Sequence, residues 1–167
     1  MAEVSHQPSF EEQKESLLQE FIAARSSILE AARSFPLDQL NEAFVGEWGI
    51  LELLAHLRGW DFTNLEASQA ILACKLPDFY SRHDRDWASY NAELVSRYKQ
   101  DNPGSMIASV EASFTELIDY LQGLSAGDIF GDHGVRRGSY KVLISRLIAA
   151  ETKDEQKHLE QIREFLG

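Results

Sequence analysis

The sequence predicts an all-α fold, an antiparallel four-helix bundle. Long segments carry apolar residues at the three- and four-residue spacing of amphipathic helices, and the prolines and glycines cluster between them. No stretch alternates like a strand with β-branched enrichment, and no internal repeat is present. With 167 residues, 44% of them hydrophobic, the chain can bury a core without disulfides. We expect residues 1–8 to form a flexible lead and residues 9–167 to form a single domain.

The first predicted helix begins near Ser9 and ends near Arg33. Ser9 and Glu12 have the spacing of a capping box, in which the side chain of each accepts a hydrogen bond from the backbone of the other. Pro36 ends this segment because proline disfavours helical backbone at the residue before it. We expect residues 36–48 to be a connection with one short helical turn.

The second predicted helix covers residues 49–73 and ends before Pro77. Residues 77–85 follow as a polar, aromatic loop. Cys74 lies at the end of the helix and is the one cysteine of the chain, which excludes an internal disulfide and fits a reducing compartment. We expect its thiol to be inert and partly buried.

The third predicted helix covers residues 86–102 and ends at an Asn-Pro-Gly turn. This turn is either a true break or a kink between two stacked segments, the second of which Ser105 would cap. Residues 123–138 are expected to be a loop rich in glycine and aspartate. The last helix spans residues 140–165, with Ser139 as its cap.

The charge of the chain excludes several classes of partner. Acidic residues outnumber basic ones by 27 to 16, which gives a net charge of −11. Binding to nucleic acid or to an anionic membrane requires a basic surface, so neither partner is expected. The N-terminus lacks the pattern of a signal peptide, and no apolar run approaches the ~18 residues of a membrane span. We therefore expect a cytoplasmic protein.

The last helix contains the most informative pattern, because its core-facing stripe becomes polar partway along. The residues that fall on or beside this inward face are Glu151, Asp154, Glu155 and His158. Charged groups that are buried are usually paired or bound to a metal. His56 lies in an apolar stretch of the second helix, and it would meet these residues if the two helices are neighbours.

Asp154 and His158 have the spacing of two ligands on one helix face, and His56 is a candidate third ligand. Two histidines and a carboxylate suit zinc, nickel, iron or manganese, and such an ion would activate a water molecule. The alternative is a metal-free set of salt bridges, with His56 hydrogen-bonded to a carboxylate. Both interpretations are open from the residues alone.

A ligand pocket is the second hypothesis. Trp60, Trp87 and Asn91 are its candidate ligand-binding residues, since indole rings can line an apolar cavity and a buried amide can orient a ligand. The alternative is that the tryptophans belong to the core and that Asn91 caps a neighbouring helix end.

Three segments together resemble the DinB-like four-helix-bundle superfamily over about residues 10–166. EWGILELLAHLRGWD resembles the second-helix signature of that superfamily, and AAETKDEQKHLEQIREFL resembles its last helix. PDFYSRHDRDWASYN is similar to the branch that includes the ClbS/DfsB proteins. The resemblance implies a helical bundle with an inter-helix pocket.

The resemblance also implies a site. Metal-binding members use three histidines, and His56 and His158 match two of these positions while Asp154 stands at the third. The implied function is a metal-dependent hydrolase or transferase that acts on a small molecule in stress response or detoxification. Glu151 or Glu155 would then be the general base or would support the metal ligands.

Two rival functions stay open at this point, and so does whether the protein is an enzyme. The first is a non-catalytic protein that binds and sequesters a small molecule without a metal. The second is a structural homodimer, because superfamily members often pair through their helices.

Overall fold

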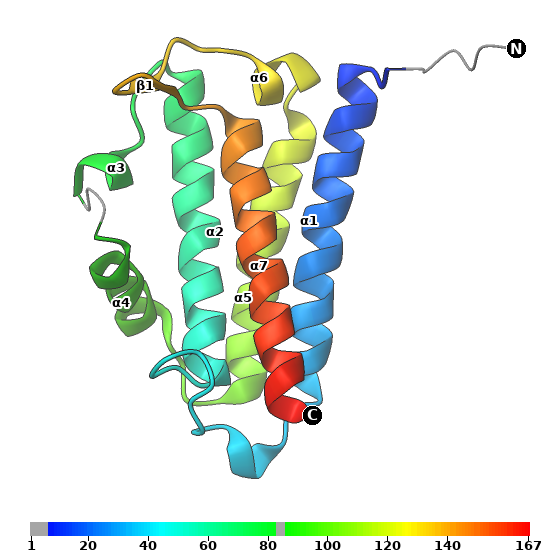
Figure 1. Cartoon of the computed structure of the whole chain (residues 1–167), viewed down its shortest axis with the longest axis vertical. Helices are drawn as coiled ribbons and strands as arrows, with labels where there is room; N and C mark the ends of the chain where they lie inside the picture. Colours follow the sequence, from blue (N-terminus) through cyan, green and yellow to red (C-terminus); the bar gives the residue numbers. More distant parts are fainter. Residues whose placement is uncertain (1–6, 83–85) are drawn as a thin grey trace, which may run out of the picture.

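The computed structural model describes residues 7–82 and 86–167, and within these residues four long helices form a bundle (Figure 1). They are α1 (Phe10–Arg33), α2 (Ile50–Leu72), α5 (Pro103–Gly123) and α7 (Ile144–Leu166). Helices α1 and α7 run in one direction, and α2 and α5 run in the other. The predicted all-α bundle is confirmed. The expected flexible lead falls largely on residues 1–6, which lie outside the described residues.

The first helix begins and ends as the sequence predicts. Ser9 Oγ accepts a hydrogen bond from the Glu12 backbone N–H at 3.2 Å, and Glu12 Oε2 accepts one from the Ser9 N–H at 2.7 Å. This reciprocal cap satisfies two backbone donors that a helix start otherwise leaves unpaired. After Pro36, a single 3₁₀ turn, η1 (Leu37–Gln39), forms the expected short helical turn.

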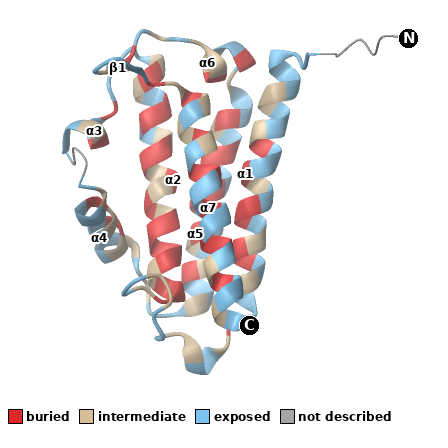
Figure 2. Cartoon of the chain, viewed as in Figure 1, coloured by how far each residue is buried: buried red, intermediate tan, exposed pale blue. Residues whose placement is uncertain are grey.

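The bundle core has an apolar cluster toward each end and a polar layer between them. One cluster includes Ile28 and Leu54, and the other includes Phe21 and Leu117. Figure 2 shows that the buried residues line the sides of the long helices that face one another. Arg25 follows Phe21 by one turn on the inner face of α1, so it enters the core between the two clusters.

The connection from α2 to α5 is a long crossover, and of the two alternatives left open by the sequence it has the true break rather than the kink between stacked segments. It contains α3 (Asp78–Arg82) and α4 (Trp87–Tyr98), and α4 packs against α2 on the outside of the bundle. The chain breaks after α4. Asn102 caps α5 by accepting a hydrogen bond from the Ser105 N–H at 2.9 Å, with Pro103 in the first turn. The prediction that Ser105 is the cap is therefore wrong.

The connection from α5 to α7 is more structured than the expected loop. It contains α6 (Ala126–Phe130) and a small antiparallel hairpin of β1 (Arg136–Arg137) and β2 (Tyr140–Lys141). Helix α7 begins after this hairpin, so Ser139 does not cap it. The hairpin lies beside the top of α2 and above α3 (Figure 1), and the Arg137 guanidinium of β1 lies 4.8 Å from the Tyr80 ring of α3.

Two further expectations concern exposed features of the chain. Cys74 is exposed rather than partly buried, and its φ of 57° places it in a left-handed turn just after α2. A left-handed residue at this position commonly ends a helix. No helix in the described part of the chain has the length and apolar character needed to cross a membrane.

Gly59 permits the close packing of α4 on α2. A Cβ at this position would lie 2.7 Å from Leu94 Cβ, which no ordinary contact allows. We expect Gly59→Ala to lower the free energy of unfolding by about 1–3 kcal/mol, because α4 must shift outward. Urea unfolding measures this loss. Gly123→Ala is the matched control, since an added Cβ there meets nothing within 4 Å; an equal loss in both variants would contradict the packing explanation.

Candidate functional site

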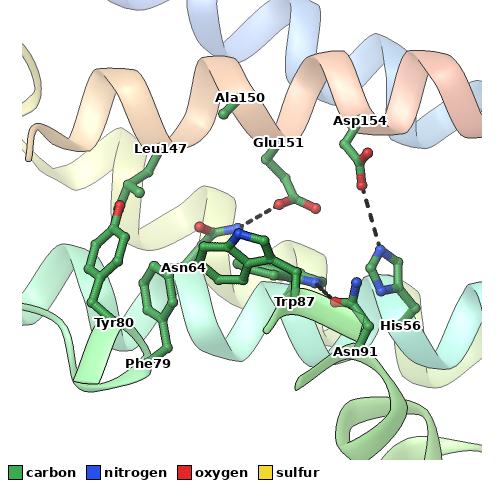
Figure 3. Close-up of a pocket in the computed structure, with 11 residues that line it drawn as sticks. His56, Asn64, Phe79, Tyr80, Trp87, Asn91, Leu147, Ala150, Glu151 and Asp154 are labelled. Atoms are coloured by element: carbon green, nitrogen blue, oxygen red, sulfur yellow. Dashed lines mark hydrogen bonds and ion pairs between the residues drawn. The ribbon is translucent and has the colours of Figure 1, made fainter. Parts of the chain in front are cut away.

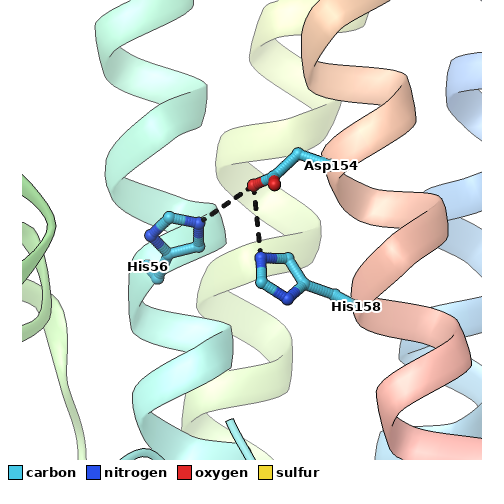
Figure 4. Close-up of side chains that lie close together, drawn as sticks. All are labelled: His56, Asp154 and His158. Atoms are coloured by element: carbon cyan, nitrogen blue, oxygen red, sulfur yellow. Dashed lines mark ion pairs between the residues drawn. The ribbon is translucent and has the colours of Figure 1, made fainter. Parts of the chain in front are cut away.

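The three predicted metal ligands come together between α2 and α7 (Figure 4). Asp154 Oδ2 lies 3.6 Å from His56 Nε2 and 3.2 Å from His158 Nε2. The two imidazole rings are 5.3 Å apart and nearly perpendicular. Both histidines are buried, whereas the Asp154 side chain is 49% exposed. The exposed carboxylate lies between the two rings and closes the site toward solvent.

Three of the four histidine nitrogens of this site lack an aligned hydrogen bond. Within the described residues, Nδ1 and Nε2 of His56 and Nε2 of His158 are buried without an aligned hydrogen bond. His158 Nδ1 lies 2.8 Å from Gln161 Oε1. When this oxygen accepts, Nδ1 carries the proton and Nε2 directs its lone pair toward Asp154. A lone pair that faces a carboxylate is unfavourable, and either a metal ion between the two groups or protonation of Nε2 relieves the repulsion.

The ionisation states of the site suit a metal ion. The adjacent His158 and His56 imidazoles hold the pKa of Asp154 well below its usual range. Burial lowers the pKa of His56, although Asp154 opposes this shift. The carboxylate is therefore anionic and the His56 imidazole neutral near neutral pH, which are the states in which both groups coordinate metals.

The spacing of the ligand atoms also fits an ion. One ligand atom from each of the three residues lies within 4.8 Å of the other two. Nitrogen and oxygen ligands about 2.1 Å from a tetrahedral zinc ion are about 3.4 Å from each other. Side-chain rotations that move each ligand atom by less than about 1 Å would bring the three atoms to the spacing that one ion requires. The fourth position would stay open for a water or a substrate.

A pocket of about 410 Å³ begins at this site and extends toward the aromatic end of α3 and α4 (Figure 3). Its walls come from α2, α3, α4 and α7. The residues that line it are His56, Trp60, Asn64, Phe79, Tyr80, Trp87, Asn91, Leu147, Ala150, Glu151 and Asp154. The predicted ligand-binding residues Trp60, Trp87 and Asn91 thus lie together at one cavity, which is large enough for a small organic molecule.

Asn91 is held by a neighbouring indole. Trp60 Nε1 donates a hydrogen bond to Asn91 Oδ1 at 2.9 Å, and this fixes the orientation of the amide between α2 and α4. Trp87 lies at the same wall, with its ring centroid 6.1 Å from that of Trp60. The contact explains how a polar amide is accommodated beside apolar side chains.

Glu151 places a carboxylate in the pocket with one oxygen unpaired. Its Oε2 accepts a hydrogen bond from Asn64 Nδ2 at 3.2 Å, whereas Oε1 is buried with no partner among the described residues. The side chain lies between the aromatic end of the pocket and Asp154 (Figure 3). Burial raises the pKa of Glu151 well above its usual range, and the Glu155 carboxylate raises it further.

Glu151→Gln is expected to raise the free energy of unfolding by about 1–2 kcal/mol near neutral pH, because the ionised carboxylate is costly to bury. A carboxyl group whose pKa is raised by folding destabilises the folded state only above its unfolded pKa, here about 4.5. The gain should therefore vanish at about pH 4 and be present at about pH 7 in urea unfolding. A gain of the same size at both pH values, or in the exposed control Glu160→Gln, would contradict this explanation.

Glu155, the other predicted catalytic carboxylate, points into the polar layer of the core and is absent from the described pocket lining. Its carboxylate accepts hydrogen bonds from Arg25 Nε at 3.1 Å and Nη2 at 2.5 Å. Arg25 also donates to both oxygens of Asp61 at 2.9 Å, and Ser113 Oγ donates to Asp61 at 2.6 Å. This buried network connects α1, α2, α5 and α7 one turn from the histidines.

Sequence reasoning missed Arg25, Asp61, Asn64 and Gln161. Arg25 lies one turn from Phe21 and from Leu29 in the apolar stripe of the first helix, and Asp61 lies one turn from Leu57 in that of the second. These positions carry the same signal that singled out Glu151, a polar residue in phase with an apolar stripe. Applied to every helix, that signal would have found the network.

The fold and the site define a class: a helical bundle with a histidine–aspartate–histidine set between two of its helices. The sequence profile of the DinB superfamily matches residues 20–162. Since this match covers most of the chain, the protein belongs to the DinB superfamily. Searches of curated proteins and of solved structures found no match.

Proposed function

We propose that this protein is a metal-dependent hydrolase or transferase that acts on a small organic molecule. One observation carries the proposal: two buried imidazole nitrogens that lack an aligned hydrogen bond lie within 3.6 Å of a carboxylate at the end of a pocket. Burying polar atoms without partners costs free energy, so such an arrangement is typical of a binding site rather than of a core. When bound by His56, Asp154 and His158, a divalent ion would supply Lewis-acid polarisation of a substrate oxygen.

Other residues would act on the substrate directly. Glu151 Oε1 is the proton acceptor that faces the pocket, and Asn64 orients the carboxylate through its hydrogen bond. A carboxyl group with a raised pKa is suited to exchange protons near neutral pH. Trp60 and Trp87 would exclude water, and the Asn91 amide would orient the ligand. Glu155 lies between Asp154 and His158 on α7. Its hydrogen bonds to Arg25 would hold this part of the helix in place from the core side.

The biological setting belongs to the same proposal. The resemblance of residues 77–91 to the ClbS/DfsB branch supports a protective role against a reactive metabolite, with hydrolysis of a strained ring as the reaction. Thiol-dependent transfer, also represented in the superfamily, is the second reaction to test.

Metal content, measured by plasma mass spectrometry on untagged protein purified without chelator, tests the proposal. We expect near-stoichiometric metal in the natural protein and none in the His56→Ala/His158→Ala variant. Absence of metal from both, even after incubation with zinc, nickel and manganese, would overturn the proposal. It would favour a metal-free protein that sequesters its ligand in the pocket.

A further inference from the structure

The charges that line the pocket are all of one sign. Glu151 and Asp154 contribute carboxylates, and none of the described lining residues is a lysine or an arginine. Arg25, the buried cation nearest in the core, is already bonded to Asp61 and Glu155. The chain as a whole carries a net charge of −11. In the metal-free protein the two carboxylates would repel an anionic ligand, whereas they would attract a cationic ligand.

Besides the His56 nitrogens, the described lining residues of this pocket contain an unpaired carboxylate oxygen, which is an acceptor. Glu151 is 7% exposed, and its Oε1 has no hydrogen-bond partner, while Oε2 is held by Asn64. Figure 3 shows the carboxylate directed into the space between α7 and the aromatic side chains. A buried carboxylate oxygen is satisfied by an N–H or O–H donor, and most strongly by a charged N–H.

The opposite end of the pocket is aromatic. Trp60, Phe79 and Trp87 pack with ring centroids 5.8–6.1 Å apart, and Tyr80 stacks on Phe79 at 4.2 Å. Aromatic rings attract cations through their quadrupoles, and tryptophan does so most strongly. One of these rings already receives a cation, because the Arg137 guanidinium lies 4.8 Å from the Tyr80 ring.

We infer that the pocket binds a protonated primary or secondary amine, whose N–H donates to Glu151 Oε1 and whose carbon skeleton packs against the aromatic side chains. The inference rests on the proposed function, because it assigns a substrate class to the same site. Amine binding itself requires no metal.

Calorimetric titration of the chelator-treated full chain with three matched probes tests this inference. The probes are 2-phenylethylammonium, its N-trimethylated form, which has no N–H donor, and 3-phenylpropionate, which has the opposite charge. We expect 2-phenylethylammonium to bind at least about tenfold more tightly than either of the others. Equal or tighter binding of 3-phenylpropionate, equal binding of the trimethylated probe, or no detectable binding of the amine would overturn the inference.

Two variants locate the contact. Glu151→Gln should weaken binding of 2-phenylethylammonium about tenfold, whereas Glu160→Gln, on the exposed side of the same helix, should not change it. Because Glu151→Gln is expected to stabilise the fold, a loss of binding would not reflect unfolding, and the probe series on the natural protein is independent of any variant. An unchanged affinity in Glu151→Gln would overturn the inference. Metal content is measured separately, so failure of amine binding and failure of the metal site are distinguishable.

Discussion

Arg25→Met should lower the free energy of unfolding by about 3–5 kcal/mol, the cost of leaving buried charges unpaired. Arg25 is fully buried, and its guanidinium is bonded to Asp61 and Glu155. Without it, two carboxylates face each other in the core, and Ser113 is the remaining donor to one of them. Urea unfolding followed by circular dichroism measures the loss.

Two comparisons identify its cause. Arg33→Met, on the same helix, removes an exposed ion pair with Glu111 and should cost less than about 1 kcal/mol. Adding Asp61→Asn and Glu155→Gln to Arg25→Met should restore much of the stability, because the unpaired charges are then absent. If Arg25→Met costs no more than Arg33→Met, the network contributes nothing to the stability of the fold.

Zinc should stabilise the chelator-treated protein by about 2.7 kcal/mol when free zinc exceeds its dissociation constant about a hundredfold. The reason is that His56, Asp154 and His158 converge only in the folded chain, since they come from two helices. Chemical unfolding at increasing zinc concentration measures the shift in the midpoint.

Variants assign this effect to the site. His158→Ala should abolish most of the zinc-dependent shift, and His133→Ala, a histidine in the loop after α6, should retain it. Gln161→Leu should weaken zinc binding by about 10–100-fold, because the hydrogen bond that orients His158 is lost. A zinc-dependent shift that survives in His158→Ala would place the ion elsewhere.

Local signals in the sequence were enough to predict the long helices. Ser9 with Glu12, and Pro36, mark the two ends of α1 because capping and proline sterics act within a few residues. Such local signals could not predict that α4 lies outside the bundle. It depends on the contact between Gly59 and Leu94, which lie 35 positions apart in the sequence. Spacing alone also left open whether the chain breaks or kinks before α5.

The sequence predicted only part of the candidate site, and it did so mainly from the pattern of the last helix. Glu151 and His158 are buried as their phase indicates, while Asp154 lies beside the inward face and stays half exposed. The partners that give these residues their properties come from elsewhere: Asn64 from α2 and Arg25 from α1. Helical periodicity gives the direction of a side chain but not the residue that it meets on another helix.

The crossover supplies one wall of the pocket from helices that do not belong to the bundle, which the order of residues in the sequence does not show. The candidate metal ligands lie on α2 and α7, whereas Phe79, Tyr80, Trp87 and Asn91 come from α3 and α4, which lie outside the bundle. On the proposed function, exchanging side chains on α3 and α4 would change which molecule is held without disturbing the candidate metal ligands or the buried network. A scaffold arranged in this way can retain one chemistry while its choice of substrate diverges.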